Sequence, residues 1–67
     1  MSVARVTEII SSSTESFEDA VKQGVARADK TLNNIQSVWV KDMKAEVRDG
    51  KITEYRTGLL VTFVLTE

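Results

Sequence analysis

Apolar and polar residues alternate along three stretches of the chain, and this period of two predicts β-strands. Residues 3–10, VARVTEII, are rich in β-branched side chains and predict the first strand. Residues 35–47 alternate in the same way, and residues 51–66 predict a return strand. The dipeptide Asp49-Gly50 between them is typical of a two-residue hairpin turn. The last two strands are therefore expected to pair as a hairpin.

Residues 14–32 follow the period of an α-helix instead. Apolar or small residues recur at steps of three and four and form one stripe: Phe17, Ala20, Val21, Gly24, Val25, Ala28 and Leu32. Ser13 is a candidate N-cap, and Ser12 with Glu15 also matches the spacing of a capping box, so the start of the helix stays open. Residues 33–34, both Asn, are expected to end the helix, because Asn tolerates the left-handed backbone conformation.

The predicted order of elements is strand, helix, strand, strand, which indicates an α+β fold in a single domain over residues 1–67. Short connections place the last strand between the other two, in the order 1-3-2, so that every neighbouring pair is antiparallel. One helix can cover only one face of such a sheet. We expect it to pack on the side of the last strand that carries Tyr55, Leu59, Val61, Phe63 and Leu65.

The face of the sheet without a helix is expected to be a subunit contact. In the second strand, one set of side chains alternates with another: Trp39, Lys41, Met43, Ala45 and Val47 with Val38, Val40, Asp42, Lys44 and Glu46. The second set is assigned to the face without a helix. Two of its members would form an apolar strip there with two residues of the last strand: Val38, Val40, Leu60 and Val64. Such exposed apolar surface is typical of an interface between identical subunits.

The small size of the chain also favours self-association. A domain of 67 residues buries a low fraction of its surface, and disulfides, metals or oligomerisation usually supply the missing stability. Disulfides are excluded because the sequence has no Cys, and only oxygen ligands for a hard cation remain because it also has no His. Oligomerisation is therefore the leading expectation, with further copies of the chain as the main partner.

The same composition excludes several function classes. Without Cys or His there is no thiolate or imidazole zinc site, no Cys–His pair and no Ser–His–Asp triad. Glu54, Tyr55 and Arg56 are consecutive strand residues that point to alternate faces, so they do not form a catalytic group. A net charge of −1 offers no cationic surface for nucleic acid, and no stretch has the pattern of a membrane span or an export signal. We expect a cytoplasmic protein that is not an enzyme.

Three strings, in this order, resemble the dodecin family: VTEIISSSTESFEDAV, ARADKTLNNI and EYRTGLLVTFVL. Each is weakly specific alone, but their order and spacing in so short a chain are much more specific. The resemblance covers nearly the whole chain. It implies a sheet partly wrapped around one helix, and an assembly of twelve copies into a hollow sphere.

The resemblance also implies where a flavin would bind. Typical flavin-binding dodecins stack pairs of isoalloxazine rings between symmetry-related tryptophans, and a Gln on the last strand hydrogen-bonds the ring edge. The tryptophan position corresponds to Ser37 and the Gln position to Arg56, so both are substituted. Trp39 lies two residues along the same side of the strand, roughly 7 Å away, and a symmetric stack fixes where each ring must stand. Tight binding of riboflavin or FMN is therefore not expected.

Other roles are favoured for these side chains. For Trp39 we favour a partly buried position at a subunit contact over a stacking platform. For Arg56 we favour a salt bridge, to Glu54 or to Glu46 of a neighbouring chain, over a contact with an anion or a flavin phosphate.

A subgroup of dodecin-like proteins lacks the tryptophan, and some of these are described as calcium dodecins. The stretch NNIQSVWVKDMKAEV resembles that subgroup, which implies calcium as a ligand. The chain has no EF-hand pattern and no three acids within a short loop. Acidic ligands would converge only through symmetry, from Asp42 and Glu46 or from Glu8 and Glu54. A solvated charged face is the favoured explanation for each of these residues.

Together these features indicate a dodecin-like hollow homo-oligomer that binds or stores a small ligand or a cation, with the calcium type favoured. Two alternatives stay open. One is a flavin-binding dodecin that uses Trp39, and the other is a purely structural oligomer with an empty interior.

Overall fold

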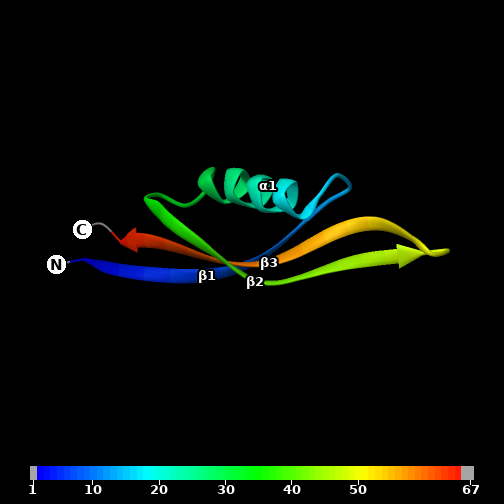
Figure 1. Ribbon diagram of the computed structural model, residues 1–67. Helices are drawn as coiled ribbons and strands as arrows, with labels where there is room; N and C mark the ends of the chain where they lie inside the picture. Colours follow the sequence, from blue (N-terminus) through cyan, green and yellow to red (C-terminus); the bar gives the residue numbers. More distant parts are fainter. Residues whose placement is uncertain (1, 66–67) are drawn as a thin grey trace.

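The computed structural model of the protein describes residues 2–65. Its elements are β1 (Val3–Ser13), α1 (Phe17–Asp29), β2 (Ile35–Arg48) and β3 (Lys51–Leu65) (Figure 1). The sheet has the order β1-β3-β2, and both pairings are antiparallel. The predicted fold is confirmed. Thr66, the last residue of the predicted return strand, lies outside the described residues.

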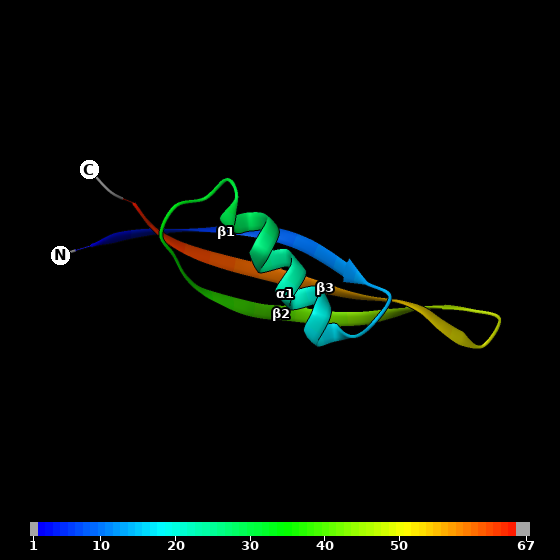
Figure 2. The ribbon, with the colours of Figure 1, turned by 90° about the horizontal axis from the view of Figure 1, so that it is seen from above.

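The helix covers one face of the sheet and only part of its length. It lies diagonally across the strands and packs mainly on β1 and β3 (Figure 2). Thirteen helical residues span roughly 20 Å, whereas the chain is 51 Å long. Beyond the pair of Ser13 with Tyr55, β2 and β3 continue without β1. No helix in residues 2–65 has the length and apolar character to span a membrane.

The helix begins later than the sequence analysis expects, and both proposed caps are wrong. The N-cap is Ser16, whose Oγ accepts the backbone N–H of Asp19 at 3.0 Å. Ser12 and Ser13 belong to β1 instead. The Ser13 hydroxyl is buried, accepts the N–H of Glu15 at 2.9 Å and donates to Oδ2 of Asp19 at 2.6 Å. Ser13 therefore ties the end of the strand to the first turn of the helix rather than capping it.

The hairpin turn is confirmed, but the helix ends at Asp29 with Lys30 as its C-cap, earlier than the predicted end at residues 33–34. Asp49 and Gly50 both have positive φ, 53° and 76°, as a two-residue hairpin turn of type I′ requires. Asn34 is also left-handed, with φ of 62°. It lies in the connection of residues 30–34, and its carbonyl accepts the N–H of Val64 at 3.0 Å just before β2 begins beside β3.

The core lies between the helix stripe and one face of β3. Leu59, Val61 and Ala20 are fully buried, as is Thr57, whose hydroxyl donates to the Ser11 carbonyl at 3.3 Å. The helix approaches closely because Gly24 has no side chain. A Cβ there would lie 2.7 Å from Cδ1 of Leu59 and 3.0 Å from Cβ of Ser11. At the other end of the helix, the rings of Phe17 and Tyr55 pack edge to face, with centroids 5.0 Å apart.

A β-bulge overturns part of the predicted face assignment. Val40 pairs with Leu59 and Asp42 with Gly58, so Lys41 has no partner and the alternation of β2 shifts by one residue. Directly paired residues share a face. Val38 and Val40, opposite Val61 and Leu59, therefore lie on the helix side, and their assignment to the bare face is wrong.

Candidate functional site

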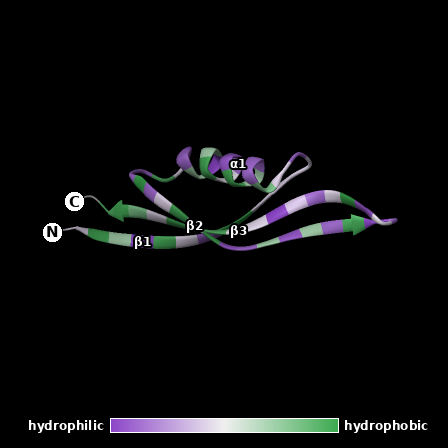
Figure 3. Cartoon of the chain, in the orientation of Figure 1, coloured by the Kyte–Doolittle hydropathy of each residue, from purple (hydrophilic) through white to green (hydrophobic). Residues whose placement is uncertain are grey.

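The side of the sheet opposite α1 gathers the candidate residues; we call it the uncovered face. Its residues alternate along each strand with those of the helix side, and hydrophobic and hydrophilic residues both occur along all three strands (Figure 3). They are Ala4, Val6, Glu8, Ile10 and Ser12 of β1, Ser37, Trp39, Asp42, Lys44 and Glu46 of β2, and Glu54, Arg56, Gly58, Leu60, Thr62 and Val64 of β3.

All seven candidate residues from the sequence analysis lie on this face: Glu8, Ser37, Trp39, Asp42, Glu46, Glu54 and Arg56. The bulge at Lys41 is responsible, because it brings Trp39 onto the same side as Asp42 and Glu46, which strict alternation would not do.

The middle of the uncovered face is apolar and open to solvent. Ile10 is 72% exposed and Trp39 is 70% exposed. Trp39 lies directly opposite Leu60, which is half-buried, and Ile10 lies one row farther along, opposite Gly58. Large apolar side chains this exposed on a small sheet are typical of a surface that another molecule covers.

One end of the uncovered face carries like charges side by side. Lys44 lies directly opposite Arg56, and in the next row Glu46 lies opposite Glu54. Like charges in direct cross-strand pairs are unfavourable. Each is balanced along its own strand, because Arg56 contacts Glu54 at 2.6 Å and Lys44 contacts Glu46 at 3.9 Å. The predicted salt bridge of Arg56 to Glu54 is thus formed within the chain.

A hollow lies between the apolar and the charged regions of this face. Gly58 forms its floor, and Ile10, Asp42, Lys44 and Arg56 are among the side chains around a volume of about 340 Å³. Asp42 leans over the glycine, since a Cβ at Gly58 would lie 2.6 Å from Oδ1 of Asp42. Sequence reasoning missed Gly58 and Lys44, because only the register of β2 against β3 places them beside Arg56 and Asp42.

Ser37 and Arg56, the positions that the resemblance assigns to flavin, are far apart within one chain. Ser37 pairs with Thr62, six residues along β3 from Arg56. At about 3.3 Å per residue this separation is roughly 20 Å. A single chain therefore does not form the flavin site, and any such site combines Ser37 of one chain with Arg56 of another. Trp39 lies one row from Ser37, on the same face, as expected.

The acidic candidates do not form a metal centre within one chain. Among residues 2–65 there is no group of three or more acidic side chains close enough to hold a metal ion. Glu8 is paired with Lys41 at 3.2 Å, and Glu46 and Glu54 each have a basic neighbour. Calcium takes six to eight oxygen ligands. One chain alone does not meet that requirement.

Comparison with known proteins gives one consistent family. The family model for dodecin matches residues 3–66. The dodecin of Thermus thermophilus is 32% identical over 65 residues, which are 97% of this chain and 94% of that protein.

Solved structures give the same result. Dodecin from Streptomyces davaonensis has a TM-score of 0.94 and 32% identity, over 98% of this chain and 97% of that one. A calcium dodecin from Mycobacterium tuberculosis, described as a calcium-chelating antigen with a novel calcium-binding site, has a TM-score of 0.83 and 34% identity. That match covers 96% of this chain and 91% of the mycobacterial chain. On its sequence and its fold, the chain belongs to the dodecin family.

Proposed function

We propose that this dodecin forms a closed homo-oligomer through the uncovered face, and that the oligomer binds or stores a small ligand or a cation. The exposure of Ile10 and Trp39 on that face carries the proposal, because a chain of 67 residues gains little stability from its own core. A dodecamer is the expected state. We further propose that it acts in the cytoplasm as a single-domain binding protein, not as an enzyme, and without nucleic acid or membrane as partner.

Flavin is not the proposed ligand. The position of the stacking tryptophan holds Ser37, and the position of the hydrogen-bonding Gln holds Arg56, whose guanidinium is engaged by Glu54 at 2.6 Å. Loss of aromatic stacking costs roughly 1 kcal/mol beyond the loss of buried area, which adds a few more. Since each 1.4 kcal/mol is a factor of ten, riboflavin is expected to bind in the micromolar range or more weakly.

Calcium is the favoured ligand of the assembly. The mycobacterial relative described as calcium-chelating is 34% identical to this chain. Asp42 supports the proposal best, because it is the acidic side chain of the uncovered face that has no ion-pair partner within residues 2–65. Several copies would have to present Asp42, or Glu46, Glu54 and Glu8 after rearrangement of their ion pairs, to supply enough oxygens.

Three measurements on the purified protein test the proposal. Light scattering should give the mass of about twelve chains. The protein should be colourless and quench added riboflavin weakly. Its melting temperature should rise with millimolar calcium and fall back with chelator, and Asp42→Asn should reduce that rise. A stable monomer at micromolar concentration would contradict the assembly, and a melting temperature indifferent to calcium would contradict the cation site.

Riboflavin binding by the protein and its variants can distinguish the flavin-binding alternative from the purely structural one. The double variant Ser37→Trp with Arg56→Gln should recover riboflavin binding if these two positions line the ancestral pocket. Tight riboflavin binding by the unaltered protein, lost in Trp39→Ser, would instead favour a flavin-binding dodecin that stacks the ring on Trp39. An oligomer that binds neither calcium nor riboflavin would favour the purely structural alternative.

A further inference from the structure

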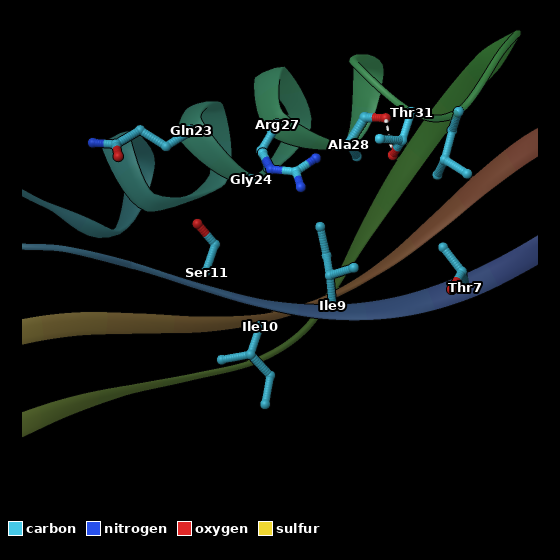
Figure 4. A pocket seen from close by; sticks show the side chains of 10 residues that line it. Thr7, Ile9, Ile10, Ser11, Gln23, Gly24, Arg27, Ala28 and Thr31 are labelled. Atoms are coloured by element: carbon cyan, nitrogen blue, oxygen red, sulfur yellow. Dashed lines mark hydrogen bonds between the residues drawn. The ribbon is translucent and has the colours of Figure 1, made fainter.

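A second concave surface lies on the opposite side of the sheet, between α1 and the edge strand β1. Figure 4 shows it from close by, with the helix above and β1 below. Its volume is about 540 Å³, within the range of ordinary small-molecule sites. None of the seven candidate residues of the uncovered face lines it. Of its lining residues, only Ile10 belongs to the uncovered face, and the other strand residues that line it lie on the helix side.

The inner wall of this cleft is apolar. Ile9 points from β1 toward the helix in Figure 4, and Leu32, just after the helix, is a further lining residue. Gly24 and Ala28 line the helix side, where both are buried. The wall therefore presents mainly apolar surface, which suits an apolar chain better than a polar ligand.

The rim of the cleft is polar and carries one charged side chain, Arg27. Arg27 is exposed and has no ion-pair partner within residues 2–65. Hydroxyl groups accompany it, with Ser11 pointing up beneath Gly24 and Thr7 farther along β1 (Figure 4). These groups can donate hydrogen bonds to an anion, and a guanidinium binds a carboxylate through two parallel bonds.

The dimensions of the cleft limit the size of a ligand. Along β1 it runs from Thr7 to Ser11, about 13 Å at 3.3 Å per residue. Along the helix it runs from Gln23 to Ala28, about 8 Å at 1.5 Å per residue, and it continues to Thr31 and Leu32 after the helix. We propose that this cleft binds a small amphiphilic carboxylate, with its anionic group on Arg27 and its apolar chain along Ile9 and Leu32.

Octanoate is a suitable probe, and calorimetric titration of the assembled protein tests the proposal. We expect octanoate to bind in the millimolar range or tighter. Acetate, which has the anion without the chain, should give no measurable heat, because the apolar contacts are worth at least about a hundredfold in affinity. Arg27→Gln should weaken octanoate about tenfold, the usual worth of one hydrogen bond to a charged group. Arg48→Gln, the same change on an exposed residue near the hairpin turn, should leave the affinity unchanged.

The fluorescence of Trp39 would detect octanoate that binds to the uncovered face instead of the cleft. It is the only tryptophan of the chain and lies on the uncovered face, so its fluorescence should not change during the titration. Equal affinity in Arg27→Gln, a Trp39 signal that follows octanoate, or no binding at all would each overturn the proposal. Light scattering on the same samples keeps this test separate from the assembly proposal, because the particle mass is expected to be the same with and without octanoate.

Discussion

The two faces of β3 differ in how far the rest of the chain buries their side chains. Leu59 and Val61, on the helix side, are fully buried. Leu60, between them in sequence, lies on the uncovered face opposite Trp39, and both Trp39 and Ile10 on that face are exposed, at 70% and 72%. All three strand residues are apolar, so burial here follows from where the single helix lies and not from hydrophobicity alone.

The comparison indicates that one face of the sheet serves folding of the chain, whereas the other serves assembly of several chains. Within one chain, α1 buries the central part of the helix-side face, because the small residues Ala20, Gly24 and Ala28 let it approach the sheet. The uncovered face has apolar side chains of similar size but no second layer within the chain. A sheet needs a layer on each apolar face, and here we attribute the second layer to further copies.

The largest expected effect is the loss of assembly on placing a charge in the uncovered face. Ile10→Asp leaves the chain's own core intact, because the side chain is exposed in the isolated chain. In the proposed oligomer it would bury an unpaired carboxylate, which is strongly unfavourable. Light scattering should show dissociation. Ala26→Asp, on the exposed side of the helix, is the matched control and should keep the parental mass. An Ile10→Asp particle of unchanged mass would remove the uncovered face from the interface.

Truncation of neighbouring leucines should separate the two faces of β3. Leu59→Ala removes a fully buried side chain and is expected to lower the free energy of unfolding by about 2–5 kcal/mol. Leu60→Ala should act mainly on the interface, so dilution should dissociate the particle at a higher protein concentration than in the parent. Urea denaturation and light scattering over a dilution series measure the two effects. Equal behaviour of both variants would argue against two functionally different faces.

Gly24→Ala should destabilise the protein although alanine is the better helix former. The propensity gain is about 1 kcal/mol. Against it stands overpacking, typically about 1–3 kcal/mol, since the new Cβ would lie 2.7 Å from Cδ1 of the buried Leu59 and 3.0 Å from Cβ of Ser11. Urea midpoints measure the net change. Ala26→Gly, at an exposed helix position, should lose about 1 kcal/mol from propensity alone. A stabilised Gly24→Ala protein would show that the helix can lift off the sheet at little cost.

The smallest expected effect distinguishes the observed helix cap from the predicted ones. Ser16→Ala removes the hydroxyl that accepts the Asp19 N–H and should cost about 1 kcal/mol. Ser12→Ala, an exposed residue of β1, should change stability by less than about 0.5 kcal/mol. Thermal melts measure the loss of stability in each variant. A larger loss in the Ser12 variant would favour Ser12 as the helix cap, as the capping-box spacing predicted.

Much of the fold was predictable because its signals are local. The period of two along residues 3–10 and 35–47, the helical stripe, and the Asp49-Gly50 turn each depend on neighbours within a few positions. The order of the strands followed from short connections alone. The helix cap was not predicted correctly because four serines between residues 11 and 16 give similar local signals. Only the packing of Ser13 against Asp19 determines which serine begins the helix.

The sequence by itself determined the elements, their order, the absence of Cys and His chemistry, and the dodecin resemblance with its substitutions at Ser37 and Arg56. Only the tertiary structure decided which side chains meet. An extra residue at Lys41 in β2 inverts the alternation that follows it, because side chains in a strand alternate with period two and one inserted residue moves every later one to the other face. Val38 and Val40, which precede the bulge, therefore stay on the helix side, whereas Asp42 and Glu46, which follow it, reach the uncovered face with Trp39 and Arg56. No local pattern marks the bulge, since it arises from how β2 pairs with a strand that follows it in the chain.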